Sequence, residues 1–398
     1  MKFVYTVLHA LRASLALLLL ATVPMGLAQG DEHPPIKVGV TASLSGNYQA
    51  QGQGLLEGLK MWVRDINARG SLLGRRVVLV GYDDESSPQK SAQLYERLIR
   101  EDKVDLLVGP YASDLTLAAS AVAEKFNIPM VSGTAASEEI WNQGFANIFQ
   151  VDLPAHKYMV GGLEIARAAG IERVGILYQD SQFTRDVASG ARAEAQQLGM
   201  EVVEFSSYSP NTRDFSDLVK GLRQQQAELV LGASYLDDSV AIVQELKRQN
   251  FSPRAVGFTS GPSLVEFGER LGADAEGVLG FTPWLRAARE PMAYDFDFRY
   301  RQLYGRSADS NSAGGYAAGE VLEAAVRLAG SLEQERVREQ LRNMSFLSIV
   351  GRYQVDEKGM QVGKSMYILQ WQNGHRALVL PARYAEVKSQ PFQPWDRR

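Results

Sequence analysis

The chain has 398 residues, a formal net charge of −4 at pH 7 and no cysteine. The acidic balance argues against nucleic acid as a partner, and the lack of cysteine excludes disulfides and thiolate metal sites. Zinc normally needs three or four convergent ligands. The four histidines lack such spacing, so we expect neither a metal nor a cofactor: they are His9, His33, His156 and His375.

Residues 1–28 are typical of a secretory signal peptide. Lys2 and Arg12 accompany the apolar run 13–21, and small residues up to Ala28 suit cleavage. Neither this run nor any other is long enough to span a bilayer. Removal of residues 1–28 takes away two cations and no acid, so the formal net charge changes from −4 to −6. We expect a soluble, exported protein of about 370 residues, a length that suits two α/β domains.

The first predicted strand, 36–41, is followed by a loop that is long for a strand-to-helix connection. Gly52, Gly54 and Gly58 then imitate a dinucleotide-binding fingerprint, with Asp83 after the second strand, 77–82, in the place of its ribose-binding acid. However, the third glycine comes one residue late and the tight turn is absent. We therefore reject a dinucleotide site.

The chain is organised around a βαβ unit that begins at the short apolar run 104–108 and ends at a second run, 128–131. Apolar residues recur at helical spacing between them. Both strands should therefore be parallel and end at the same sheet edge, where ligands bind in open α/β sheets. The loops found there are 109–113 and 132–137.

These two loops suit a small carboxylate. Helix N-termini present unpaired backbone N–H groups, and Ser113, Thr134 and Ser137 add hydroxyl donors. The alternative is that Ser113 and Ser137 only cap helices that begin at Asp114 and Glu138.

A strand at 147–151 completes the first lobe, and the break at 152–154 indicates a crossing into a second lobe. The alternation of strands and helices there predicts a second parallel sheet rather than a mixed one. Its strands are expected at 173–178, 201–205, 228–232, 255–258 and 277–281. After another break at 282–284, helices at 294–304, 313–329 and 333–342 should return to the first lobe, and the strands 351–355 and 365–372 should cross a last time.

Loops after the second lobe's strands should face the first lobe's loops across a cleft. Phe183 and Tyr235 can supply flat apolar walls, and Asp237 or Asp238 could meet a cation. Alternatively, the two aspartates only cap the following helix.

The mature chain resembles the type I periplasmic solute-binding proteins of ABC importers, of the leucine/isoleucine/valine-binding kind. Singly the shared motifs are weak, but their order is specific. They are IKVGVTASLSG at 36–46, DINARG at 65–70, YDD at 82–84, VGPYAS at 108–113, IPMVS at 128–132, DFSDL at 214–218 and DEKG at 356–359.

The resemblance implies an α/β fold of two Rossmann-like lobes with parallel central sheets and a three-segment hinge. The lobes would comprise residues 29–152 plus 284–363 and residues 153–283 plus 364–398. They would close on a ligand in the periplasm and dock on a membrane-embedded ABC permease, and we expect the protein to be a monomer.

The resemblance also maps a site. Ser113, Thr134 and Ala136 match positions that hold an amino acid's carboxylate. The family often has a hydroxyl residue where this chain has Ala136, so the contact there, as at Ala135, would be a backbone N–H or would shift to Ser137.

The ammonium contacts map onto Tyr235 and Ser260, but amino-acid binders commonly have a glutamate in place of Ser260. Either Asp237 or Asp238 replaces it, or the ligand has no ammonium group. In the family, an aromatic residue forms one wall of the ligand site. This chain has Gln51 at that position, with Tyr48 nearby in the sequence.

We therefore expect a binding protein that captures an amino acid, of branched-chain type or similar, or another small carboxylate. The alternative ligand is an aromatic or aliphatic acid or amide without an ammonium group. A secreted hydrolase is disfavoured, since the chain has no G-x-S-x-G motif and no suitable order of Ser, His and Asp. We expect no catalysis.

Overall fold

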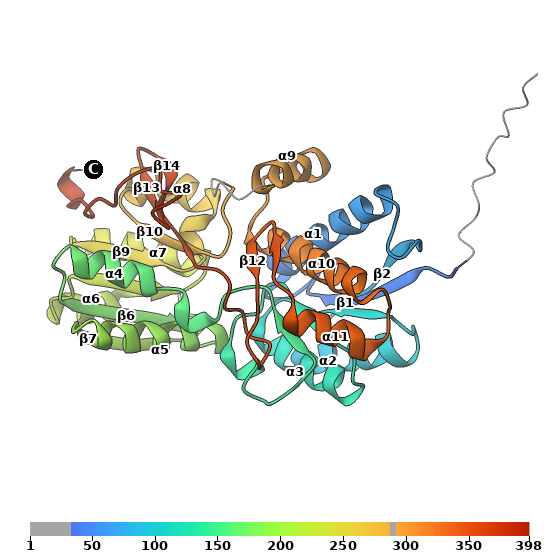
Figure 1. The fold of residues 1–398 in the computed structure, drawn as a ribbon. Helices are drawn as coiled ribbons and strands as arrows, with labels where there is room; N and C mark the ends of the chain where they lie inside the picture. The colour runs from blue at the N-terminus through green and yellow to red at the C-terminus, as the bar shows by residue number, and fades with distance from the viewer. Residues whose placement is uncertain (1–32, 287–291, 398) are drawn as a thin grey trace, which may run out of the picture.

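The computed structural model describes residues 33–286 and 292–397, which form two α/β lobes side by side (Figure 1). The predicted signal peptide lies outside the described residues. In the described part of the chain, no helix has the length and apolar character to cross a membrane.

The first lobe is built on a five-stranded sheet in the order β2-β1-β3-β4-β5, in which each neighbouring pair is parallel. Its strands are β1 (Ile36–Ala42), β2 (Val77–Asp83), β3 (Leu106–Val108), β4 (Met130–Ser132) and β5 (Ile148–Gln150). The helices of its first half are α1 (Gln49–Ala68), α2 (Pro88–Arg100) and α3 (Ser113–Lys125).

The second lobe is built on a seven-stranded sheet in the order β14-β13-β10-β9-β8-β6-β7. Its strands are β6 (Arg173–Gln179), β7 (Glu201–Tyr208), β8 (Leu229–Ala233), β9 (Ala255–Phe258), β10 (Leu279–Thr282), β13 (Tyr367–Gln372) and β14 (His375–Leu380). Its helices are α4 (Val160–Ala168), α5 (Gln182–Gln197), α6 (Ser216–Gln224), α7 (Leu236–Arg248) and α8 (Val265–Leu271).

The chain passes between the lobes three times, after β5, after β10 and before β13. After the second crossing it forms α9 (Ala293–Tyr304), α10 (Ser310–Ala329), α11 (Gln334–Asn343) and an antiparallel ribbon of β11 (Phe346–Ser348) and β12 (Gly351–Tyr353). α10 packs against α1 and α11 in the first lobe. The assignment of strands to two sheets follows the predicted order, whereas the exact lobe boundaries stay a prediction.

Two local expectations were wrong. The second sheet is mixed, because β13 pairs antiparallel with β10 and continues into β14 through the two-residue turn Asn373–Gly374. Both turn residues have positive φ, as a tight hairpin requires.

The second wrong expectation is the helix at Glu138, because no long helix follows Ser137. A single 3-10 turn, Glu138–Ile140, forms, and Gly144 at a φ of +77° helps to lead the chain toward β5.

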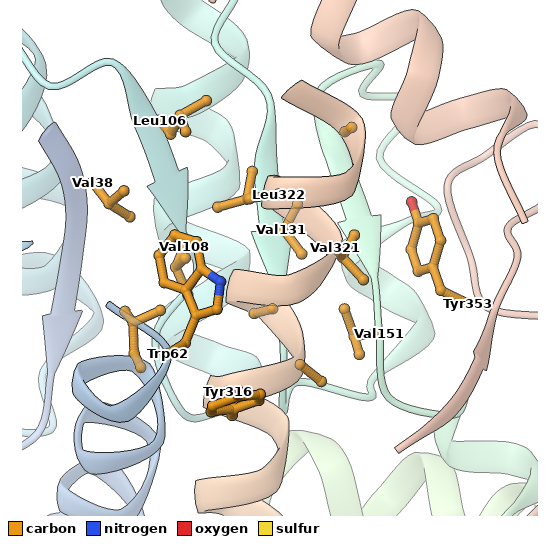
Figure 2. Close-up of a cluster of buried hydrophobic side chains, with 14 of the residues drawn as sticks. Val38, Trp62, Leu106, Val108, Val131, Val151, Tyr316, Val321, Leu322 and Tyr353 are labelled. Atoms are coloured by element: carbon orange, nitrogen blue, oxygen red, sulfur yellow. The ribbon is translucent and has the colours of Figure 1, made fainter. Parts of the chain in front are cut away.

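The core of the first lobe lies between the sheet and helices α1 and α10. Trp62 of α1 and Leu322 of α10 are fully buried against strand residues such as Val38 and Val108 (Figure 2). The two helices approach closely because glycines face their contact. A Cβ at Gly58 would lie 1.9 Å from the backbone oxygen of Ser312. Gly58 is one of the three glycines that resemble a dinucleotide-binding fingerprint in the sequence. In the structure its role is to let the two helices pack closely.

Candidate functional site

A cavity of about 550 Å³, partly open to solvent, lies between the lobes at the carboxyl ends of both sheets. This is the edge at which open α/β sheets bind ligands. The first crossing contributes Asp152 to its lining, and the second contributes Pro283. Its lining residues are Tyr111, Ala112, Ser113, Thr134, Asp152, Tyr158, Phe183, Tyr235, Ser260, Ser263, Phe281, Thr282, Pro283, Ser310 and Asn311.

The first lobe contributes two hydroxyl groups from the loops after β3 and β4. The Oγ atom of Ser113 accepts the backbone N–H groups of Ala136 at 3.3 Å and of Ser137 at 3.2 Å, which joins the two loops. The hydroxyl proton of Ser113 therefore remains available for a ligand. Thr134 Oγ1 is buried and has no hydrogen-bond partner among the described residues. Since an unpaired buried hydroxyl is costly, a ligand acceptor that reaches Thr134 Oγ1 would recover that cost.

The capping interpretation of the two serines does not match the structure. Ser113 is the first residue of α3, Ala112 is its N-cap, and no side chain caps that helix. Ser137 precedes only the 3-10 turn and makes no capping bond. The serines instead connect segments that are distant in the sequence.

Three residues of the loop 132–137 were predicted to contact the ligand but bind other parts of the protein instead: they are Ala135, Ala136 and Ser137. Ala135 donates its N–H to Ser132 Oγ at 3.3 Å, and the N–H groups of Ala136 and Ser137 are those bound to Ser113. Ser137 Oγ donates to Asp186 Oδ2 on α5, in the other lobe. These three residues do not line the cavity, so their N–H groups are not among its free donors.

The second lobe brings Phe183, Tyr235 and Ser260 to the cavity, as the sequence predicts. Phe183 lies in the first turn of α5 and packs edge-on against Tyr158, with ring centroids 5.1 Å apart. Tyr235 is the N-cap residue of α7, and burial raises the pKa of its hydroxyl to about 12. These rings provide the apolar walls that a small organic ligand needs.

Asp237 and Asp238, the predicted partners of an ammonium group, do not line the cavity. Asp237 is 82% exposed and pairs with Arg270 at 2.6 Å. Asp238 is buried and accepts hydrogen bonds from Gln179 at 2.8 Å and Tyr208 at 3.2 Å. Both belong to the first turn of α7, two and three residues past the N-cap Tyr235.

Tyr48 and Gln51 also lie outside the lining. Tyr48 is the N-cap residue of α1 and stands behind the cavity wall, with its ring 5.6 Å from that of Tyr111. Its hydroxyl donates to Asp114 at 3.4 Å. Gln51 lies in the first turn of α1, two residues beyond the start of that helix.

The cavity contains a carboxyl group that the sequence interpretation missed. Asp152, in the first crossing, is only 5% exposed, and its two oxygens accept bonds from Tyr158 at 2.9 Å and from the N–H of Leu153 at 2.6 Å. Burial raises the pKa of Asp152 to about 6, although the charge of Lys364 in the third crossing lowers it. In the sequence, the only indication of this carboxyl group is an acidic residue in the segment 152–154, which is predicted to connect the two lobes.

The remaining lining residues were also missed because they lie on distant elements. Tyr111 is in the predicted loop, but Ser310 and Asn311 come from the start of α10 and Phe281 and Thr282 from the end of β10. Periodicity gives no indication that a helix start more than 150 residues away in the sequence meets the loops after β3 and β4.

A family model for the periplasmic binding protein matches residues 35–376. The chain belongs to this family. The match spans both lobes and all three crossings, so it confirms the resemblance that the ordered motifs indicate.

Individual relatives and solved structures are similar to this chain over most of its length. The Leu/Ile/Val-binding protein homolog 7 of Brucella suis is 27% identical over 96% of this chain and 98% of its own length. A putative branched-chain amino acid ABC transporter structure from Silicibacter pomeroyi has a TM-score of 0.81 at 22% identity, covering 91% of this chain and 100% of its own. A solute-binding protein from R. palustris in complex with benzoate has a TM-score of 0.76 at 18% identity, covering 90% and 98%. At these identities the structures establish the shared two-lobed fold.

Proposed function

We propose that this protein captures a small carboxylate-bearing solute between its lobes and delivers it to a membrane-embedded ABC permease. The observation that carries the proposal is the interlobe cavity, in which the hydroxyl groups of Ser113 and Thr134 are both able to donate. A ligand carboxylate accepting from both would satisfy the unpaired Thr134. The matching relatives carry the names of Leu/Ile/Val-binding proteins, and one structural neighbour holds benzoate.

The cavity favours an amino acid over an acid without an ammonium group. Asp152 gives the cavity a buried carboxyl group on the chain that connects the lobes. An ammonium group beside it would form a charge-assisted hydrogen bond, which contributes about 1.5–3 kcal/mol, or roughly a tenfold gain in affinity or more. Asp152, rather than Asp237 or Asp238, is thus the acidic partner of the ligand's ammonium group in this proposal.

The remaining parts of the proposal concern export and docking. A cleavable signal at residues 1–28 would place the mature protein in the periplasm. There a monomer would present both lobes to the permease only when closed, a population shift driven by the ligand's preference for the closed form.

Calorimetry on ligand-stripped mature protein tests the proposal with leucine, isoleucine and valine against benzoate and short aliphatic acids. Binding of an amino acid should strengthen as the pH rises through about 6, where Asp152 ionises. Binding of an acid that lacks the ammonium group should weaken over the same range, because the two negative charges repel. Failure of every carboxylate to bind would overturn the proposal.

Asp152→Asn separates the two ligand classes. It should weaken amino-acid binding about tenfold or more. It should leave unchanged or strengthen the binding of a simple acid.

A further inference from the structure

A second cavity, of about 390 Å³, lies beside the first one and is also formed by both lobes. Ser263, Thr282 and Ser310 line both cavities, so the two spaces meet at these residues. The other residues of the second cavity are Trp284, Leu285, Arg286, Asp297, Arg301, Ser307, Ala308, Asp309 and Arg376.

Three guanidinium groups face this second cavity, and two of them share one carboxylate. Asp297 of α9 is 1% exposed, and its Oδ2 atom is 3.2 Å from Arg286 and 2.9 Å from Arg301. Its Oδ1 atom accepts the N–H of Ala308 at 2.9 Å. Asp297 therefore has three partners in the described structure, and Arg376 is not one of them.

One oxygen of the other lining carboxylate caps a helix. Asp309 is the N-cap residue of α10, and its Oδ1 atom accepts the N–H of Ser312 at 2.8 Å. Glu266, on α8, acts on Arg376 through its charge, but it is exposed and is not within ion-pair distance in the described structure. Among the described residues the lining has three arginines and two aspartates, so its positive charge is only partly compensated.

Arg376 on β14 is the arginine of this lining that has no ion pair among the described residues. Its Nη1 donates to the backbone oxygen of Ser263, and no carboxylate of the described residues forms an ion pair with it. Burial lowers the pKa of its guanidinium even though Glu266 and Asp297 act in the opposite direction. Of the five N–H donors of an arginine, one has an acceptor here, so the site has both charge and donors to offer.

We propose that the second cavity holds a second anionic group of the solute, a distal carboxylate, against Arg376 with support from Arg286 and Arg301. The proposal rests on the proposed function, because the first carboxylate must bind at Ser113 and Thr134 for the other end to enter this cavity. It narrows the solute class to dicarboxylates, including acidic amino acids. Ser263, Thr282 and Ser310 lie where the connecting part of the solute would pass.

Calorimetry with the mature, ligand-stripped protein tests this with succinate, glutarate and adipate against the monocarboxylates butyrate, valerate and hexanoate; glutamate against norvaline gives the same comparison with an ammonium group present. At least one dicarboxylate should bind ten or more times more tightly than its monocarboxylate partner. Arg376→Gln should reduce that affinity about tenfold or more and change monocarboxylate binding less than twofold. Arg376→Lys should restore part of the loss, since it keeps the charge.

Arg270→Gln is the matched control, because Arg270 pairs with exposed Asp237 and does not line this cavity. It should change neither class of ligand. Arg286→Gln provides a second route if Arg376→Gln does not fold, and it should also weaken dicarboxylates selectively. If monocarboxylates bind as tightly as dicarboxylates, or if both cavity variants leave the difference intact, only this inference is overturned. If neither class binds, the proposed function is overturned with it.

Discussion

Thr134 shows at the scale of a single residue how ligand binding and stability can oppose each other. Its hydroxyl is buried without a partner, and such a group costs free energy in the ligand-free protein that a ligand acceptor would recover. Ser113 differs, because its oxygen already accepts two backbone N–H groups. The two hydroxyls therefore predict different mutational phenotypes.

Thr134→Val should weaken carboxylate binding about tenfold or more, since a bond to a charged acceptor is lost. The free energy of unfolding of the ligand-free protein should be unchanged or slightly higher, because the unpaired hydroxyl is removed. Calorimetry and urea denaturation measure the two effects. Loss of stability with unchanged affinity would mean that Thr134 serves packing only.

Asp152 should make the ligand-free protein less stable as the pH rises. Its folded pKa is about 6 against an ordinary value of 3.8, so between these values the folded state binds more protons than the unfolded state. The free energy of unfolding must then fall as the pH rises through this interval and level off above it. The difference between the wild type and Asp152→Asn, measured by urea denaturation from pH 4 to 7.5, should show this slope. Parallel curves would contradict it.

At the scale of elements, the contact of α1 with α10 determines where the cavity wall stands. Gly58 meets the backbone of Ser312, and Gly315 meets that of Leu55, where an added Cβ would lie 2.1 Å from the carbonyl oxygen. Backbone atoms cannot give way as a flexible side chain can. Ser310 and Asn311 begin α10 and line the cavity, so a shift of this helix would also change the site.

Gly58→Ala should lower the free energy of unfolding by about 1–3 kcal/mol, the usual cost of overpacking, and should weaken ligand binding. Gly221→Ala is its control. Gly221 lies within α6, and its added Cβ would meet only the end of the Glu204 side chain, at 3.4 Å. There the better helix propensity of alanine should stabilise by up to about 1 kcal/mol. Thermal unfolding compares the two, and equal effects would contradict the close-contact explanation.

At the scale of the whole molecule, the lobes are joined not only by the crossings but also by side-chain contacts beside the cavity. Asp186 of α5 accepts bonds from Ser137 Oγ and, at 3.2 Å, from the N–H of Glu138. Ser137 and Glu138 belong to the first lobe, so these bonds exist only when the lobes are together. They stabilise the closed form without lining the cavity.

Asp186→Ala should therefore shift the ligand-free protein toward the open form and weaken ligand binding by at least about two- to tenfold, the range expected for the net contribution of one of the two hydrogen bonds that it removes. Small-angle X-ray scattering should give a larger radius of gyration without ligand and a normal one at saturation. Ser137→Ala should act in the same direction but less strongly, because it removes only one of the two bonds. If only the Ser137 variant weakened binding, Ser137 would be a ligand contact, as the sequence had suggested.

The sequence by itself determined the features that depend on local pattern. Short apolar runs separated by helical stripes predict buried parallel strands, and the ordered motifs identify the two-lobed family, because each signal is contained within a few neighbouring residues. It also placed Ser113 and Thr134 at the carboxyl edge of the first sheet, and Phe183, Tyr235 and Ser260 at that of the second, since parallel strands end together. Their role as ligand contacts stays a prediction.

Only the tertiary structure decided which charged groups face the ligand space. Asp237 and Asp152 are both acidic residues beside a predicted loop, yet one pairs with Arg270 at the surface and the other is buried in the cavity. The gathering of Arg286, Arg301 and Arg376 likewise joins the second crossing, α9 and β14. Side-chain direction and long-range juxtaposition depend on how whole elements pack, and no local pattern in the chain encodes that.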